Sequence, residues 1–199
     1  EPMQGEPNFD WINAFPYLQI IGSLLYLAMN TRPDIMFAVC LLARYAKSKQ
    51  FAACRGVAHL LSYLAGTVEQ GVRYTLKRER RGGVLEQILD LFGMSDADWA
   101  SCLRSRRSTA GWLVFALGGP IAWGSKLMTT IAASSMESEY MAAYYLGQQL
   151  LWCRGLMREL GHQMQRPITF FMDAMAALQA LENHALRARS KHIAVKIRW

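Results

Sequence analysis

The sequence predicts an α/β protein in which a mixed sheet with flanking helices follows a small helical segment. Three observations support this prediction. Apolar residues recur at helical spacing along the front of the chain, and after Gly71 they alternate with polar residues as in a half-buried strand. Strand-like runs are then followed by a helix, a strand and a helix, which is the order expected for a layered fold with a mixed sheet.

The front segment contains three predicted helices. They cover residues 17–29, 31–45 and 51–64. Pro33 and Asp34 favour a helix start, because proline near the first turn loses no needed hydrogen bond and a carboxylate complements the positive helix end. Gly66 is expected to end the third helix in the left-handed conformation.

The rest of the chain is predicted to form strands and two more helices. The strands are expected over residues 72–76, 88–95, 110–117, 120–126 and 168–172, and the helices over 135–160, ended by Gly161, and 174–182. Gly118-Gly119 indicates a hairpin turn between the third and fourth strands. Lys77 to Arg81 is interpreted as a charged break, so we place a domain boundary near Gly82-Gly83. The predicted domains are residues 1–82 and 83–199.

Composition narrows the class of protein. The chain has 22 Lys and Arg against 15 Asp and Glu, a net charge of +7, which favours a polyanionic partner such as nucleic acid. A hydrophobic content of 52% argues against a disordered or collagen-like chain. The apolar runs are too short to cross a bilayer, so no membrane partner is expected. The scattered cysteines favour an intracellular compartment.

Three carboxylates lie on or beside apolar elements. Asp96 and Asp173 each follow a predicted strand, and Glu139 lies near the start of the predicted long helix. If the two strands are neighbours, these side chains come together and repel one another unless cations neutralise them. Hard oxygen ligands suit Mg²⁺, and two such ions support phosphodiester cleavage.

The sequence leaves alternatives open for these carboxylates. Asp173 precedes an alanine-rich segment and is equally well explained as a helix N-cap. Asp96 and Asp98 share one strand face, so periodicity does not choose between them. Glu137 fits a capping box, in which its side chain folds back onto the backbone of the N-cap residue. Glu139 lies roughly 200° further around the helix, so at most one of the two glutamates faces a site.

Arginines follow the Asp96 segment in a short polar stretch. Arg104, Arg106 and Arg107 have the charge needed to contact a phosphate backbone. We interpret the stretch as a solvated loop, because that is the commoner role of a short basic run.

Several motifs occur in the order found in copia-type LTR retrotransposon polyproteins. The run IGSLLYL from Ile21, followed by TRPDI from Thr31, resembles the segment just after the reverse transcriptase palm. The motifs that look like those of the ribonuclease H domain that follows are SDADWA from Ser95, RSTAG from Arg107, SSMESEY from Ser134 and KHI from Lys191. The resemblance covers most of the chain.

This resemblance implies a ribonuclease H-like fold and a nuclease function. The implied reaction is Mg²⁺-dependent hydrolysis of the RNA strand of RNA·DNA hybrids during reverse transcription, by attack of water at a site with two ions. Asp96 matches the first carboxylate position, Glu139 the helix glutamate, and Asp173 the acid that ends the next strand. The implied partners are the hybrid and the reverse transcriptase palm of the same polyprotein, in a cytoplasmic particle or the nucleus.

The sequence departs from the family pattern near its end. Ala194 stands where the motif usually reads Lys-His-Ile-Asp, and the chain stops at Trp199, before the strand and helix that would supply a fourth carboxylate. We therefore expect a C-terminally truncated domain with weakened endonuclease activity. The alternatives are a decayed or domesticated fragment that at most binds nucleic acid, and a helical module that only docks on the palm.

Overall fold

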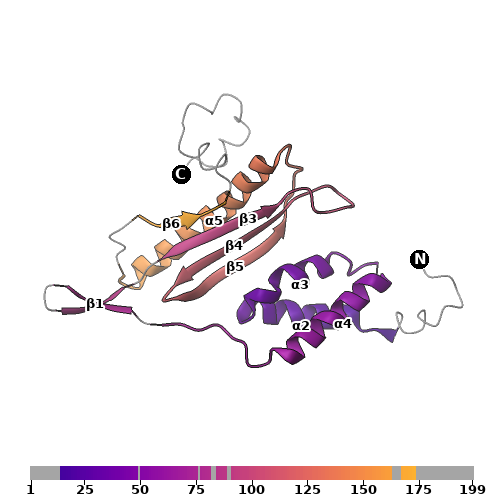
Figure 1. The fold of residues 1–199 in the computed structure, drawn as a ribbon, viewed down its shortest axis with the longest axis horizontal. Coiled ribbons are helices and arrows are strands. Elements are labelled where there is room, and N and C mark those ends of the chain that lie inside the picture. The colour runs from indigo at the N-terminus through magenta and orange to yellow at the C-terminus, as the bar shows by residue number, and fades with distance from the viewer. Residues whose placement is uncertain are drawn as a thin grey trace, which may run out of the picture. The chain divides into compact units, whose positions relative to one another are not determined.

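The computed structural model describes residues 14–48, 50–75, 77–81, 84–88, 91–162 and 167–173. They form two compact units, one up to Val72 and one from Arg73. The first unit is helical and the second contains a sheet with a long helix, so the chain has the predicted α/β character (Figure 1). The division between the units falls between Val72 and Arg73, and the predicted boundary at Gly82-Gly83 lies outside the described residues.

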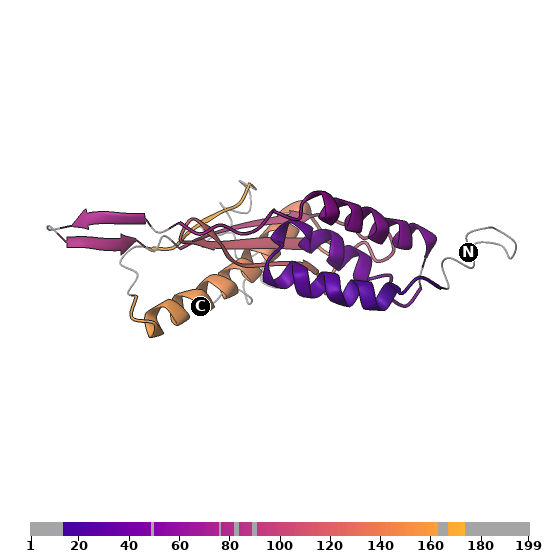
Figure 2. The same cartoon turned by 90° about the horizontal axis from the view of Figure 1, so that it is seen from below.

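The first unit contains the three predicted helices. Figure 2 shows them packed together, and the second begins as a short 3₁₀ turn, η1, where Pro33 restricts the backbone. Its core consists of side chains at helical spacing from each helix, including Ile21, Val39 and Val57. The elements are α2 (Tyr17–Asn30), η1 (Pro33–Ile35), α3 (Met36–Ala43) and α4 (Phe51–Gly66).

A buried arginine joins the start of the second helix to the end of α4. The Arg32 guanidinium forms an ion pair of 2.8 Å with Asp34 and donates hydrogen bonds of 3.1 and 2.7 Å to the carbonyl and hydroxyl oxygens of Thr67. The Tyr63 hydroxyl donates to Asp34 at 2.9 Å. The Arg32 guanidinium lowers the pKa of the Asp34 carboxyl. Asp34 is therefore an ion-pair partner as well as a residue near a helix start.

Of the two glycines predicted to end helices, Gly66 and Gly161, only Gly161 adopts the left-handed conformation. Gly66 is still helical, and the chain leaves α4 at Thr67 with φ of −131°, so the predicted left-handed cap at Gly66 is wrong. The hydrogen bonds from Arg32 to Thr67 explain this, because they fix the residue after the helix without a left-handed turn. Gly161 has φ of +86° directly after the long helix ends, as a C-terminal glycine commonly does.

A four-stranded mixed sheet forms the centre of the second unit. The strands lie in the order β5-β4-β3-β6, with β3, β4 and β5 antiparallel and β6 parallel to β3. This arrangement confirms both the predicted meander and the predicted mixed sheet. The strands are β3 (Phe92–Asp98), β4 (Thr109–Ala116), β5 (Gly119–Leu127) and β6 (Thr169–Phe171).

The segment before this sheet differs from the sequence prediction. Residues 77–81, predicted as a break, form β1 (Lys77–Arg81), which pairs antiparallel with β2 (Val84–Ile88) in a separate hairpin. The predicted strand over 72–76 is wrong for residues 72–75, which lie outside any strand, although the Thr75 amide donates to the Leu117 carbonyl at 2.6 Å. The predicted strand over 88–95 also spans two elements. Backbone pairing decides these boundaries, and composition does not reveal it.

The β4–β5 hairpin turn lies one residue earlier than predicted. Its central residues are Leu117 and Gly118, with φ of +55° and +74°, as a type I′ turn requires. Gly119 begins β5, and a Cβ there would collide with the carbonyl oxygen of Arg73. Gly118 thus has a backbone angle that favours glycine, and the missing side chain of Gly119 allows a close approach of the Arg73 backbone.

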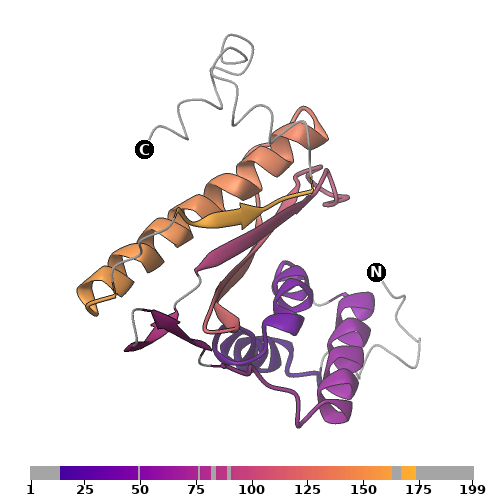
Figure 3. The same cartoon turned by 60° about the vertical axis from the view of Figure 1, so that its left-hand side comes forward.

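One long helix covers one face of the sheet. α5 (Ser135–Glu159) packs on β3 and β4, as Figure 3 shows. Leu146 is fully buried against Gly93 of β3, where an added Cβ would come within 2.5 Å of the leucine Cδ1. Trp112 of β4 stacks on Tyr145 with ring centroids 5.6 Å apart. In the described part of the chain no helix, α5 included, has the apolar length that a bilayer crossing requires.

We predict that Leu146→Ala lowers the free energy of unfolding of the second unit by about 2–5 kcal/mol, because it leaves a cavity between α5 and the sheet. Leu103→Ala is the matched control, since Leu103 is 89% exposed and Leu146 is 0% exposed. The control should change stability by less than about 0.5 kcal/mol in urea unfolding. Equal losses in the two variants would contradict the packing described.

Candidate metal centre

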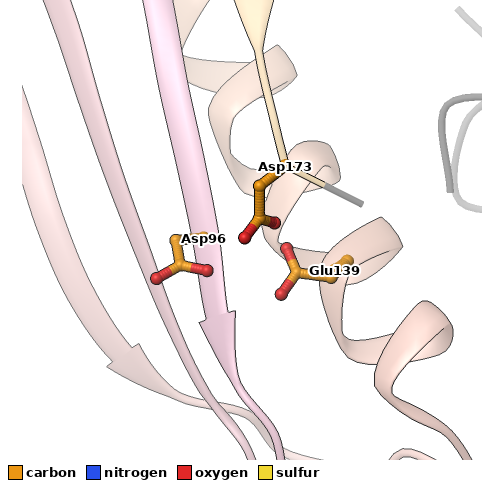
Figure 4. Close-up of side chains that lie close together, drawn as sticks. All are labelled: Asp96, Glu139 and Asp173. Atoms are coloured by element: carbon orange, nitrogen blue, oxygen red, sulfur yellow. The ribbon is translucent and has the colours of Figure 1, made fainter. Parts of the chain in front are cut away.

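Three elements bring the three predicted carboxylates together. β6 runs parallel to β3, so the ends of both strands lie at the same end of the sheet. Asp96 comes from β3, Asp173 follows β6, and Glu139 lies in the first turns of α5 (Figure 4). One carboxylate oxygen of each lies within 4.8 Å of the others. The neighbouring strands that the sequence could only assume are therefore present.

The cluster includes Asp96 and not Asp98. β3 continues to Asp98, so the prediction that Asp96 follows the end of its strand is wrong: Asp96 lies inside the strand, opposite Gly111 of β4. Its Oδ1 accepts a hydrogen bond of 2.9 Å from the Ala97 amide. The residues that would decide whether Asp173 is a helix N-cap lie outside the described part of the chain.

Helix capping determines which glutamate joins the cluster. The Ser134 hydroxyl accepts from the Glu137 amide at 3.2 Å, as the capping box predicts. The Glu137 carboxylate accepts from the Ala133 amide at 2.7 Å, one residue before the predicted partner. Glu137 is thus engaged at the helix start, and Glu139, on the other side of α5, faces β3.

Glu139 is the most constrained member of the cluster. It is 8% exposed, and its Oε1 accepts a hydrogen bond of 3.1 Å from the Ala97 amide. Its Oε2 is buried without a hydrogen-bond partner. Burial, followed by the negative charge of Asp96, raises the pKa of Glu139 to about 7.

The donor set fits a hard divalent cation. A buried carboxylate oxygen without a partner is costly, and a cation beside it removes both the orphaned acceptor and the repulsion among the acids. Three carboxylates and no sulfur or imidazole favour Mg²⁺ or Ca²⁺ over zinc. Among the described residues this is the one such group found. The KHI motif at Lys191 and the Ala194 departure lie outside them.

Fold and cluster together define the class: an α/β protein with a three-carboxylate centre suited to a divalent cation. Sequence similarity to known proteins identifies the chain more closely than this class does. The chain is 34% identical over 184 residues to a retrovirus-related Pol polyprotein from transposon TNT 1-94 of Nicotiana tabacum, covering 92% of this chain and 13% of that protein. It is 35% identical over 179 residues to the Pol polyprotein from transposon RE2 of Arabidopsis thaliana, covering 90% and 12%.

The homologues of this chain thus include retrotransposon Pol polyproteins, and the chain is similar to a segment of them. It spans about an eighth of the length of these two relatives. It is also 39% identical over 137 residues to secreted RxLR effector protein 161 of Plasmopara viticola, covering 69% of this chain and 90% of that protein. No protein-family model and no solved structure matches the chain.

We predict that the metal-free protein loses thermal stability as the pH rises from about 5 to about 8. The folded protein holds the Glu139 proton to a pKa of about 7, against an ordinary value of 4.5, so the unfolded chain releases it first. The stability from this bound proton is complete at low pH and is lost as the pH passes through about 7.

Circular dichroism melts in a chelating buffer measure this effect. Glu139→Gln should flatten the fall in melting temperature and raise the value at pH 8, since glutamine carries no titrating charge. Asp98→Asn, outside the cluster, is the control and should keep the fall. The same pH profile in the Glu139→Gln protein would show that this carboxyl does not cause it.

Proposed function

We propose that this chain carries a ribonuclease H-type nuclease domain, which hydrolyses the RNA strand of RNA·DNA hybrids with Mg²⁺ during reverse transcription. The observation that carries the proposal is the cluster itself: carboxylate oxygens of Asp96, Glu139 and Asp173 within 4.8 Å, with a buried, unpartnered Oε2 on Glu139. Similarity to retrotransposon Pol polyproteins and a net charge of +7 support a nucleic-acid substrate.

Each residue has a distinct part in this proposal. Asp96, Glu139 and Asp173 would hold the Mg²⁺, which when bound activates water and stabilises the leaving oxygen of the phosphodiester. Asp96 and Asp173 are exposed and open the site to a substrate, whereas the Ala97 amide orients the buried Glu139. With a pKa of about 7, Glu139 is partly protonated at neutral pH without metal, so cation binding displaces a proton.

We also propose the reverse transcriptase palm of the same polyprotein as the partner of the first unit. α2 exposes three large apolar side chains, Leu18, Tyr26 and Met29. These exposed side chains would supply apolar contacts in an interface with the palm. The resemblance of this helix to the segment after the palm supports that choice of partner.

A non-catalytic role is the second candidate. The Plasmopara viticola relative is described as a secreted effector, and this chain covers 90% of it, so a related segment exists outside a Pol polyprotein. In that role the chain would be a decayed or domesticated fragment that at most binds nucleic acid through its positive charge. Such binding should weaken steeply with salt and should not depend on the carboxylates.

Cleavage of an RNA·DNA hybrid labelled on its RNA strand distinguishes the two roles. We predict Mg²⁺-dependent cleavage by the full chain, reduced about a hundredfold or more by Asp96→Asn, because an amide is a much poorer cation ligand. Asp98→Asn is the matched control, on the same strand and outside the cluster, and should retain activity.

The two functions give opposite results in this assay. Cleavage that is equal in the Asp96→Asn and unaltered proteins would mean that the cluster is not catalytic. No cleavage by the unaltered chain, together with salt-sensitive hybrid binding that survives Asp96→Asn, would favour the non-catalytic role.

A further inference from the structure

We propose that the loop between β3 and β4, residues 99–108, is a preformed phosphate-binding element. It binds the sugar-phosphate backbone of the nucleic-acid substrate beside the carboxylate cluster. We call it the arginine loop, after Arg104, Arg106 and Arg107. The proposal rests on the proposed function for the identity of the substrate. It assigns substrate binding to residues outside the cluster.

Both ends of the arginine loop are tied to the segment that leads into α5. The Trp99 indole donates to the Ala132 carbonyl at 3.2 Å, and the Met128 amide donates to the Ser108 carbonyl at 2.9 Å. The Ser108 side chain is fully buried and accepts from the Ala100 amide at 3.0 Å, which closes the base of the loop. These bonds fix the loop to the structure that carries Glu139.

The tip of the loop has a defined backbone as well. The Cys102 amide donates to the Arg107 carbonyl at 3.1 Å, and the Arg106 amide donates to the Cys102 carbonyl at 2.6 Å. Ala100 and Arg106 have φ of 51° and 54°, a region that residues with a Cβ seldom adopt. Such a loop loses little backbone entropy when it binds a ligand.

The three arginine side chains are exposed and form no ion pair with a described residue. The ion pair found among the described residues joins Arg32 and Asp34 in the other unit. A guanidinium matches the geometry of a phosphate and binds it with two parallel hydrogen bonds. The loop therefore presents cationic groups that no described carboxylate neutralises.

The loop lies at the end of the sheet that bears the cluster. Figure 3 shows the β3–β4 connection beside the start of α5, and the Trp99–Ala132 bond joins the two. A strand rises about 3.3 Å per residue, so the loop begins about 10 Å beyond Asp96. A duplex presents a phosphate on each strand about every 3.4 Å of its axis. A nucleic-acid strand bound at the cluster thus has neighbouring phosphates within reach of the arginine loop.

The positive charge of the arginine loop counteracts a repulsion between the carboxylate cluster and the phosphates of the substrate. Asp96, Glu139 and Asp173 repel the phosphates that the proposed substrate must bring to them. A fixed cationic loop nearby offsets that repulsion and holds the substrate in register. Sequence alone favours a solvated loop for these arginines, but the bonds at the base and tip indicate a built binding element.

Hybrid binding by Asp96→Asn protein tests the proposal without requiring cleavage. In this background, Arg104→Gln with Arg107→Gln should weaken binding about tenfold or more at low salt. It should also reduce the slope of log K against log salt by about 0.9 for each lost phosphate contact. Arg154→Gln with Arg158→Gln is the matched control, because it removes the same charge from exposed positions in the last turns of α5.

Lysine replacements separate a charge effect from a folding effect. Arg104→Lys with Arg107→Lys should recover much of the affinity and salt slope that the glutamine variant loses. Equal binding by the loop variant and its control, or no hybrid binding by the unaltered chain, overturns the proposal. If the loop variant binds like its control while the unaltered chain still cleaves hybrid, the arginine loop is rejected and the proposed nuclease function stands.

Discussion

The parallel pairing of β3 with β6, beside the start of α5, is the constraint on which the site depends. It holds three carboxylates together although their charges oppose the arrangement. The Ala97 amide donates a hydrogen bond to Glu139, and Leu146, seven residues further along α5, packs on Gly93 of β3. Hydrogen bonding and packing together therefore position the acids. The folded chain thus maintains an electrostatic cost that a proton or a divalent cation relieves.

Periodicity and capping made much of the fold and site predictable from sequence. The apolar spacing of the front helices identified each one, because helices are stabilised by local contacts. The capping pattern at Ser134 separated Glu137 from Glu139, because the N-cap fixes the rotation of the helix that follows. These are short-range properties, which residues next to one another in the chain determine.

Long-range pairing was not predictable in the same way. The β1–β2 hairpin and the true start of β3 depend on which backbone segments meet, and the charged run at Lys77 gave no indication of pairing. The sequence does not show that β6 lies beside β3, so this pairing could only be assumed. The arginines of the loop are recognisable in the sequence as charges, but the hydrogen bonds that join Trp99 to Ala132 and Ser108 to Met128 link residues distant in sequence.

Similarity to retrotransposon Pol polyproteins and the acidic cluster both support the proposed nuclease function. The proposal needs a divalent cation at the cluster, and the three carboxylates are ligands that suit one. Calorimetric titration of Mg²⁺ into the full chain tests this requirement most directly. We expect saturable binding that Glu139→Gln abolishes and Asp98→Asn preserves. Binding that survives Glu139→Gln, or no binding by the unaltered chain, would contradict a cation site at these three carboxylates.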